Sequence, residues 1–186
     1  MNTRRICLIA LMTATLTGGK LALSSIPNVE IVTLLLVVYA LTMKRTDAII
    51  ACLIFCVLEI FIWGFWLWWV ILYFIYWPAL VITVSFLPKK KYGFIIAIAI
   101  GIAFTAFFGV LSTLIEITIA GALATGRFWE YFYYRYAAGI PFFLTHIISN
   151  SIILPVLVPI LYKTLSTLNA RYNKKCQGEI SSDVSP

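Results

Sequence analysis

Acidic residues and histidine are scarce in this chain. Its 186 residues include 14 Lys and Arg but only 7 Asp and Glu and 1 His, so that 11% of the residues are charged. Soluble domains carry about a quarter charged residues, whereas the hydrophobic fraction here is 62% and the mean hydropathy is +1.00. This shortage of charge excludes a soluble domain and indicates a polytopic membrane protein.

Catalytic and metal-binding motifs are also missing. The single histidine excludes a multi-histidine metal site, and the four cysteines show no metal-ligand spacing. No HExxH, GxSxG or aspartate cluster for magnesium-dependent phosphotransfer occurs. The segment Thr17–Lys20 resembles the end of a phosphate loop, but Ala14 and Leu21 replace the glycine and the Ser or Thr that such a loop requires. We therefore expect a protein that is not an enzyme, has no cofactor and does not hydrolyse ATP by itself.

Long apolar runs without alternation predict membrane-spanning helices rather than a β-barrel. The expected fold is an all-α membrane protein, a compact bundle of six transmembrane helices within residues 1–168, followed by a cytoplasmic, disordered tail over residues 169–186. The expected spans are Ile6–Leu23, Val29–Met43, Ala48–Gly64, Trp69–Leu87, Gly93–Ile117 and Gly139–Leu165. The polar and aromatic segment Thr118–Ala138 is expected to form a partly helical cap outside the membrane.

The basic residues predict the topology. With the N-terminus in the cytoplasm, eleven Lys and Arg fall on the inner side, and only Lys20, Arg127 and Arg135 fall outside. The positive-inside rule therefore favours six spans with both termini cytoplasmic. A cleaved signal peptide over residues 1–25 is the competing interpretation and would leave five spans.

An aromatic stretch at Leu58–Pro78 dominates the predicted outer side. It holds ten aromatic residues, among them five of the six tryptophans, and begins beside the intramembrane acid Glu59. Aromatic side chains collect at membrane interfaces, but so many rings at one junction also suit the stacking of a planar ligand. An acid at this depth is a candidate for ligand binding or proton transfer, although Glu59 could instead pair with Lys20 or Arg135.

Two further patterns stand out in the first and last predicted spans. Ala10 and Ala14 lie one turn apart on one face, where small side chains allow another helix to approach closely, from this chain or from a partner. His146 and Asn150 also lie one turn apart, in the outer half of the last span. Polar side chains at that depth face the bundle interior or a cavity, either to contact a ligand or to form an interhelical hydrogen bond.

Together these features resemble the S components of energy-coupling factor (ECF) vitamin importers, in particular the riboflavin-transporter-like group. The distinctive phrases are Ile26–Thr33 (IPNVEIVT), Gly139–Phe143 (GIPFF) and His146–Asn150 (HIISN), together with Ala10 and Ala14. Phe143 stands where many members of that family carry an acid.

The resemblance implies a function and a set of partners. An S component of the bacterial cell membrane captures a vitamin or related micronutrient from outside with high affinity. It then docks through the Ala10 and Ala14 face on a membrane T component that two ATPase subunits energise, and it releases its ligand inward. No nucleic acid is involved, because the positive charges lie in short clusters between apolar runs.

The predicted ligand site opens outward, and its acids and rings favour a planar, hydrogen-bonding ligand, with a cation as one option. Its expected residues are Asn28, Glu30, Glu59, Trp63, Trp66, Trp69, Tyr73, Glu116, His146 and Asn150. Two other functions stay open at this point. One is an intramembrane enzyme that uses Glu59 and His146 as an acid–base pair, and the other is a small-molecule carrier that works alone.

Overall fold

The chain folds into helices that follow its apolar runs. A computed structural model describes residues 3–27, 29–88 and 92–182, with side chains described as far as residue 168. The elements are α1 (Thr3–Ala22), α2 (Val32–Thr42), α3 (Arg45–Trp63), α4 (Leu67–Ser85), α5 (Gly93–Ile119), the 3-10 helix η1 (Ala122–Thr125) and α6 (Phe128–Ser182). All except α2 and η1 are long and apolar enough to cross a membrane. The protein is thus all-helical in its described residues, with the pattern of a multi-pass membrane protein.

The short helix α2 lies at the centre of the bundle. Its 11 residues are apolar on all sides, and ten of them are buried against the neighbouring helices. A helix of this length measures about 16 Å, roughly half the thickness of the hydrocarbon core. Without neighbours it would expose apolar surface in every direction, so its position follows from its composition. The expectation of six spans counts this segment as Val29–Met43, and that count stays a prediction.

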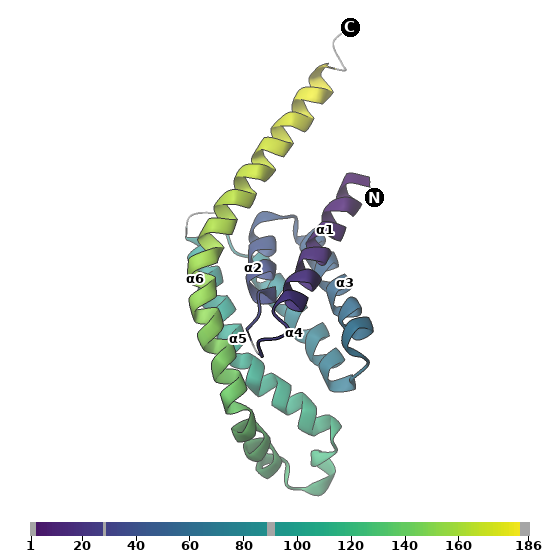
Figure 1. Cartoon of the computed structure of the whole chain (residues 1–186), viewed down its shortest axis with the longest axis vertical. Coiled ribbons are helices and arrows are strands. Elements are labelled where there is room, and N and C mark those ends of the chain that lie inside the picture. The colour runs from purple at the N-terminus through teal and green to yellow at the C-terminus, as the bar shows by residue number, and fades with distance from the viewer. Residues whose placement is uncertain (1–2, 28, 89–91, 183–186) are drawn as a thin grey trace.

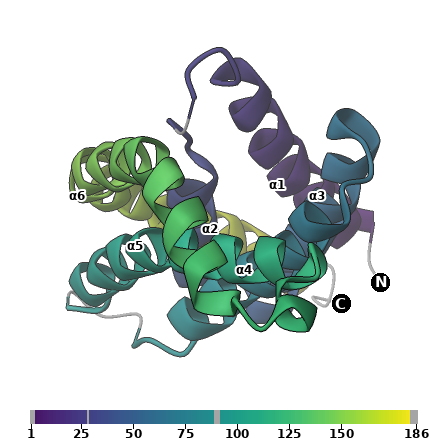
Figure 2. The same cartoon turned by 90° about the horizontal axis from the view of Figure 1, so that it is seen from below.

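The other helices surround α2. The most extensive contacts are those between α5 and α6, which form a hairpin that extends past the rest of the bundle at the end away from the N-terminus (Figure 1). On the opposite side, α1 packs on α3 and α3 packs on α4. The view along the bundle shows α2 enclosed between these groups (Figure 2). The start of α1 and the end of α6 lie toward the same end of the molecule (Figure 1), while the cytoplasmic location of both termini stays a prediction.

Polar contacts join the helix ends on the side of the N-terminus. Arg5 donates from Nε to Asp47 Oδ1 at 2.6 Å and so links the start of α1 to the start of α3. Arg45 donates to the Ser85 carbonyl at 3.2 Å, and its guanidinium lies 3.9 Å from the Phe86 ring centroid. These contacts bring the basic residues at the starts of α1 and α3 to one end of the bundle. The predicted inner cluster Lys89–Lys91 lies outside the described residues.

The last helix differs from the sequence-based expectation at both ends. Over Thr118–Ala138, the segment expected to form a partly helical cap, α5 continues to Ile119, η1 follows between Gly121 and Gly126, whose φ angles are +82° and +69°, and α6 begins at Phe128. The helix starts early because its aromatic residues recur every turn, and the rings of Phe132 and Tyr136 stack at 5.6 Å. At the other end α6 stays helical to Ser182, through most of the region expected to be a disordered tail, of which residues 183–186 lie outside the described part.

Candidate functional site

A cavity of about 410 Å³ opens at the end of the bundle away from the N-terminus. It lies where α1 and α3 end and α2 and α4 begin, with α5 and α6 closing its inner side. Its size falls within the roughly 300–1,000 Å³ typical of small-molecule sites. Its walls are formed by Lys20, Leu23, Ser24, Ile26, Pro27, Val29, Glu30, Val32, Cys56, Glu59, Ile60, Trp63, Gly64, Trp66, Trp69, Val70, Tyr73, Trp77, Phe108 and His146.

Aromatic rings from the α3–α4 junction form one wall. Gly64 ends α3 with φ +86°, a value that favours glycine, and so lets the chain turn at once into α4. Along α4, the ring centroids of Trp69 and Tyr73 lie 5.2 Å apart and those of Tyr73 and Trp77 lie 5.9 Å apart, both edge to face. The exposed fraction of these side chains falls from 62% at Trp66 to 4% at Trp77. This arrangement offers ring faces to a ligand from the mouth of the cavity to its depth.

A charged cluster from three helices lies against this wall. The Lys20 ammonium, at the end of α1, forms an ion pair with Glu59 Oε2 of α3. It also donates to Tyr73 Oη of α4 at 2.9 Å, and its nitrogen lies 5.9 Å from the Trp63 ring centroid. Glu59 is only 5% exposed, and a buried carboxylate is stable only when it is paired. Lys20 therefore compensates the Glu59 charge, which burial would otherwise disfavour.

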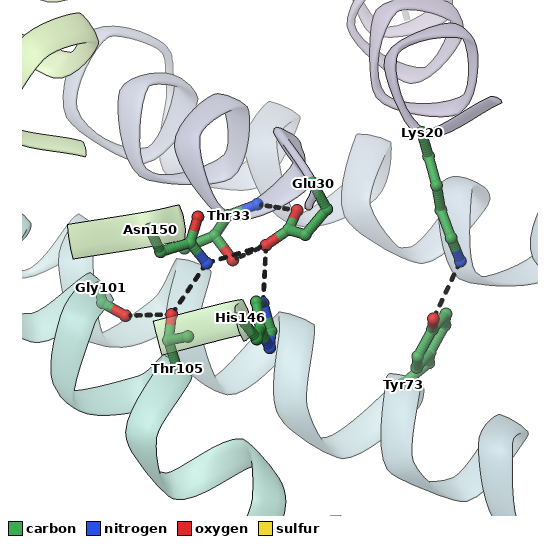
Figure 3. A network of polar contacts seen from close by, with 8 residues as sticks. All are labelled: Lys20, Glu30, Thr33, Tyr73, Gly101, Thr105, His146 and Asn150. Carbon is green, nitrogen blue, oxygen red and sulfur yellow. Dashed lines mark hydrogen bonds and ion pairs between the residues drawn. The ribbon is translucent and has the colours of Figure 1, made fainter. Parts of the chain in front are cut away.

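A second polar cluster surrounds Glu30, apart from the contact between Lys20 and Tyr73 (Figure 3). Thr33 donates its backbone N–H to Glu30 Oε2 at 2.9 Å and its hydroxyl to Oε1 at 2.5 Å. Asn150 donates to Oε1 at 3.2 Å, and His146 Nε2 lies 3.1 Å from the same atom. Because an ionised carboxylate only accepts hydrogen bonds, these contacts fit a Glu30 carboxylate with His146 donating from Nε2.

The same cluster joins three helices. The Glu30 carboxylate lies at the N-terminal end of α2, where free backbone N–H groups favour a negative charge. Asn150 of α6 donates a further hydrogen bond to Thr105 Oγ1 of α5 at 3.1 Å, and Thr105 donates to the Gly101 carbonyl at 2.9 Å (Figure 3). With Asn150 fully buried, this cluster fixes the start of α2 against α5 and α6.

The structure brings most of the expected ligand-site residues together. Those that line the cavity are Glu30, Glu59, Trp63, Trp66, Trp69, Tyr73 and His146. Asn150 lies behind Glu30 and contacts it without lining the cavity. Glu116 is not among the lining residues and forms an ion pair with Arg135 between α5 and α6. Asn28 lies outside the described residues. A role in ligand binding stays a prediction for all of them.

The structure adds lining residues that the sequence analysis does not single out as ligand contacts. Trp77 follows Tyr73 by one helical turn, so the i+4 spacing on one face of α4 was a usable signal. Phe108 of α5 carried no such signal, because α5 is apolar on all sides. Its ring meets His146 edge to face at 5.2 Å and closes the cavity from the side.

Phe143, the position at which the resemblance departs from its family pattern, does not line the cavity. A Cβ atom added to Gly109 or Gly139 would come within 2.7 or 2.6 Å of its ring. The phenyl ring therefore fills the space above two glycines, one on α5 and one on α6, and packs these helices together.

Ala10 and Ala14 are exposed and lie in an apolar groove of about 350 Å³ between α1 and α3. The other residues that line this groove are Ile6, Ile9, Thr13, Ile50, Ile54 and Leu58. The two alanines thus lie on an exposed side of α1 and leave space beside it rather than packing within the bundle.

The chemistry of the cavity is that of recognition by rings and paired charges. Within the described part of the chain, no group of three or more His, Cys, Asp and Glu side chains is placed to hold a metal ion. Glu59 and His146 line the same cavity, but Glu59 is paired with Lys20 and His146 contacts Glu30. In comparisons with known proteins, no family model, no curated protein and no solved structure matched this chain.

Proposed function

We propose that this protein is the substrate-binding membrane subunit of an ECF-type importer for a vitamin or a related micronutrient in a bacterial cell membrane. In this proposal the chain spans the membrane six times with both termini in the cytoplasm, and the cavity opens to the outside. The observation that supports it most directly is the cavity of about 410 Å³. It combines an aromatic wall with two carboxyl groups that are held by other side chains.

The placement of charge is consistent with this orientation. Arg5 and Arg45 lie at one end of the bundle, which is also the end toward which α1 starts and α6 ends. The cavity lies at the other end, where the short connections and the aromatic rings are found. A ligand site at the outer end and a basic inner end are what a subunit for uptake requires.

The groove at Ala10 and Ala14 supports docking on a T component. In a bilayer, helices associate through close packing at small residues rather than through the hydrophobic effect. Leucine at both positions would fill the groove and hold a partner helix away from α1. The cavity lining contains neither alanine, so ligand binding should be unaffected.

The function is tested with two measurements on the same preparations. The chain is purified from its native membrane, and the bound small molecules are identified by mass spectrometry. The Ala10→Leu/Ala14→Leu double variant and an Ile148→Leu control, on an exposed face of α6, are then co-purified with the T component and ATPases of the source organism. We expect the double variant to lose at least about 90% of the complex while it keeps its small molecule, and the control to keep both.

Other outcomes would contradict the proposal in distinct ways. Complex formation that is unchanged in the double variant would refute docking through this groove. Uptake into vesicles that contain only this chain, without ATP, would indicate a carrier that works alone. A small molecule recovered in chemically altered form would indicate an enzyme that uses Glu59 and His146.

A further inference from the structure

One end of the cavity has hydrogen-bonding capacity that no described side chain uses. Glu59 lines the cavity and is only 5% exposed, and its Oε1 atom is buried without a hydrogen-bond partner in the described residues. Its other oxygen, Oε2, accepts from Lys20. Since buried acceptors are nearly always satisfied, an unpaired carboxylate oxygen in a cavity wall indicates a position for a ligand donor.

The second carboxyl group in the cavity has a different status. Glu30 receives hydrogen bonds at both oxygens, from Thr33, Asn150 and His146. Three of these contacts fall on Oε1 and one on Oε2, so each oxygen of Glu30 already has a protein partner. Glu30 therefore holds the protein together, whereas Glu59 has an acceptor left for a ligand.

Hydrogen-bond donors lie directly beside the free Glu59 oxygen. The Lys20 ammonium has three N–H groups, of which two contact Glu59 and Tyr73. Because Tyr73 Oη accepts from Lys20, its own hydroxyl hydrogen points elsewhere and can be donated. The cluster thus presents one acceptor and two donors next to each other.

The charge of this cluster argues against an ionic ligand group. Lys20 and Glu59 compensate each other in a direct ion pair. An anionic group placed here would face the Glu59 carboxylate, and a cationic group would face the Lys20 ammonium. Like charges at such short range, away from water, are strongly unfavourable. A neutral group with its own donor and acceptor has no such penalty.

The neighbouring rings restrict the shape of the ligand. The Trp63 ring centroid lies 5.9 Å from Lys20 Nζ, and Trp69 packs against Tyr73 at 5.2 Å. A flat ligand whose edge reaches Glu59 and Lys20 would have indole rings beside its faces. Stacking on such rings is favourable for conjugated ligands.

We propose that the ligand is a neutral, planar nitrogen heterocycle that carries an N–H donor next to a carbonyl or ring-nitrogen acceptor, as in a cyclic amide. The N–H donates to Glu59 Oε1, and the acceptor receives hydrogen bonds from Lys20 and Tyr73. This proposal rests on the proposed function as a binding subunit and narrows its substrate from planar molecules in general to this edge pattern. It also excludes a cationic ligand, which the acidic and aromatic residues of the sequence had left as one option.

The test uses four two-ring probes that differ only in the edge group. They are quinolin-2(1H)-one, its 1-methyl derivative, the cation 1-methylquinolinium and the anion quinoline-2-carboxylate. Binding to the purified full chain in detergent is measured by calorimetry and by quenching of tryptophan fluorescence. We expect quinolin-2(1H)-one to bind tightest. The 1-methyl derivative, which cannot donate to Glu59, should bind about tenfold or more weakly, since a hydrogen bond to a charged group is worth that much.

Two variants test the assignment of the residues. Lys20→Met leaves the Glu59 charge without compensation, so the order of affinity should change and 1-methylquinolinium should become the tightest probe. Glu59→Gln removes the charged acceptor and should weaken quinolin-2(1H)-one by about tenfold. The control is Glu130→Gln, at an exposed Arg127 ion pair outside the cavity, which should bind like the parent. Size-exclusion profiles identify any variant that does not fold, and the probe series on the parent chain decides the question without variants.

The results separate the two proposals. Equal affinity for both lactams, tightest binding of either ion, or no binding of any probe overturns the neutral edge pattern. In each of these cases, a small molecule that co-purifies from the native membrane leaves the binding function in place. Absence of both probe binding and a co-purified molecule overturns the binding function as well.

Discussion

The Asn150→Leu substitution tests whether the Glu30 cluster holds the bundle together. Asn150 is fully buried and donates hydrogen bonds to Glu30 Oε1 and to Thr105 Oγ1. Leucine has nearly the same shape, so the change removes two hydrogen bonds without opening a cavity. In water-soluble proteins a bond to a charged group contributes about 1.5–3 kcal/mol and a neutral one about 1 kcal/mol, which gives an upper value of about 4 kcal/mol.

The membrane lowers this value. Hydrogen bonds between transmembrane helices contribute about 0.6 kcal/mol each on average, because side chains find other partners when the helices separate. Two such bonds give a lower value of about 1 kcal/mol. We expect the loss in the free energy of unfolding to lie between these two limits.

The free energy of unfolding is measured in mixed micelles as SDS is added, with tryptophan fluorescence as the signal. The control is Thr145→Leu, at an exposed position of α6 whose hydroxyl bonds only within its own helix, to the Pro141 carbonyl. It should change the free energy of unfolding by less than about 0.5 kcal/mol. A double-mutant cycle with Glu30→Gln isolates the coupling. If Asn150→Leu costs no more than the control, or if the two sites are additive, Glu30 and Asn150 do not hold α2 against α6.

Two further substitutions test the packing and the charges of the bundle. Gly109→Ala should lower the free energy of unfolding by about 1–3 kcal/mol, because the added Cβ would lie 2.7 Å from the Phe143 ring. Gly18→Ala, with open space around it inside α1, should instead raise the free energy of unfolding by about 0.5–1 kcal/mol. The same SDS titration measures both variants, and equal effects would contradict the close α5–α6 contact. Asp47→Asn should lower the melting temperature in detergent, because it removes the charge that pairs with Arg5. Since the Arg5 side chain is 37% exposed, the free energy of unfolding should fall by about 1 kcal/mol at low salt and by less in 1 M salt. A loss that does not depend on salt would show that packing rather than charge is responsible.

The sequence predicts α1, α3 and α4 well because each of them is a long apolar run. The predicted spans at Ile6–Leu23, Ala48–Gly64 and Trp69–Leu87 overlap α1, α3 and α4, with their ends displaced by one to three residues. The start of α6 could not be found this way, since the segment from Phe128 to Ala138 is too polar to look like a membrane span. Its ring positions recur every turn, however, and the contact between Phe132 and Tyr136 shows that this spacing was the better guide.

The level of the candidate site along the helices can be predicted from the sequence, but the ion-pair and hydrogen-bond partners of its residues cannot. That Glu30, Glu59 and His146 lie at one level of the bundle follows from counting residues along apolar helices, and all three line the cavity. Which groups face each other depends on how each helix is rotated about its axis. Hydropathy does not give that rotation for a helix that is apolar on all sides, as α2 and α5 are. The sequence thus left Glu59 with two candidate partners, and the fold pairs it with Lys20 while Arg135 goes to Glu116.

Helices α1 and α3 contribute residues both to the ligand cavity and to the groove at Ala10 and Ala14. Lys20 of α1 lines the cavity, and Ala14, six residues or about 9 Å earlier on the same helix, lines the groove. On α3 the two surfaces come still closer, because Leu58 lines the groove and its neighbour Glu59 lines the cavity. The ion pair of Lys20 with Glu59 therefore joins these two helices at the boundary between the surfaces. Any shift of α1 along α3 must change the distance between these two charges and the shape of the groove together.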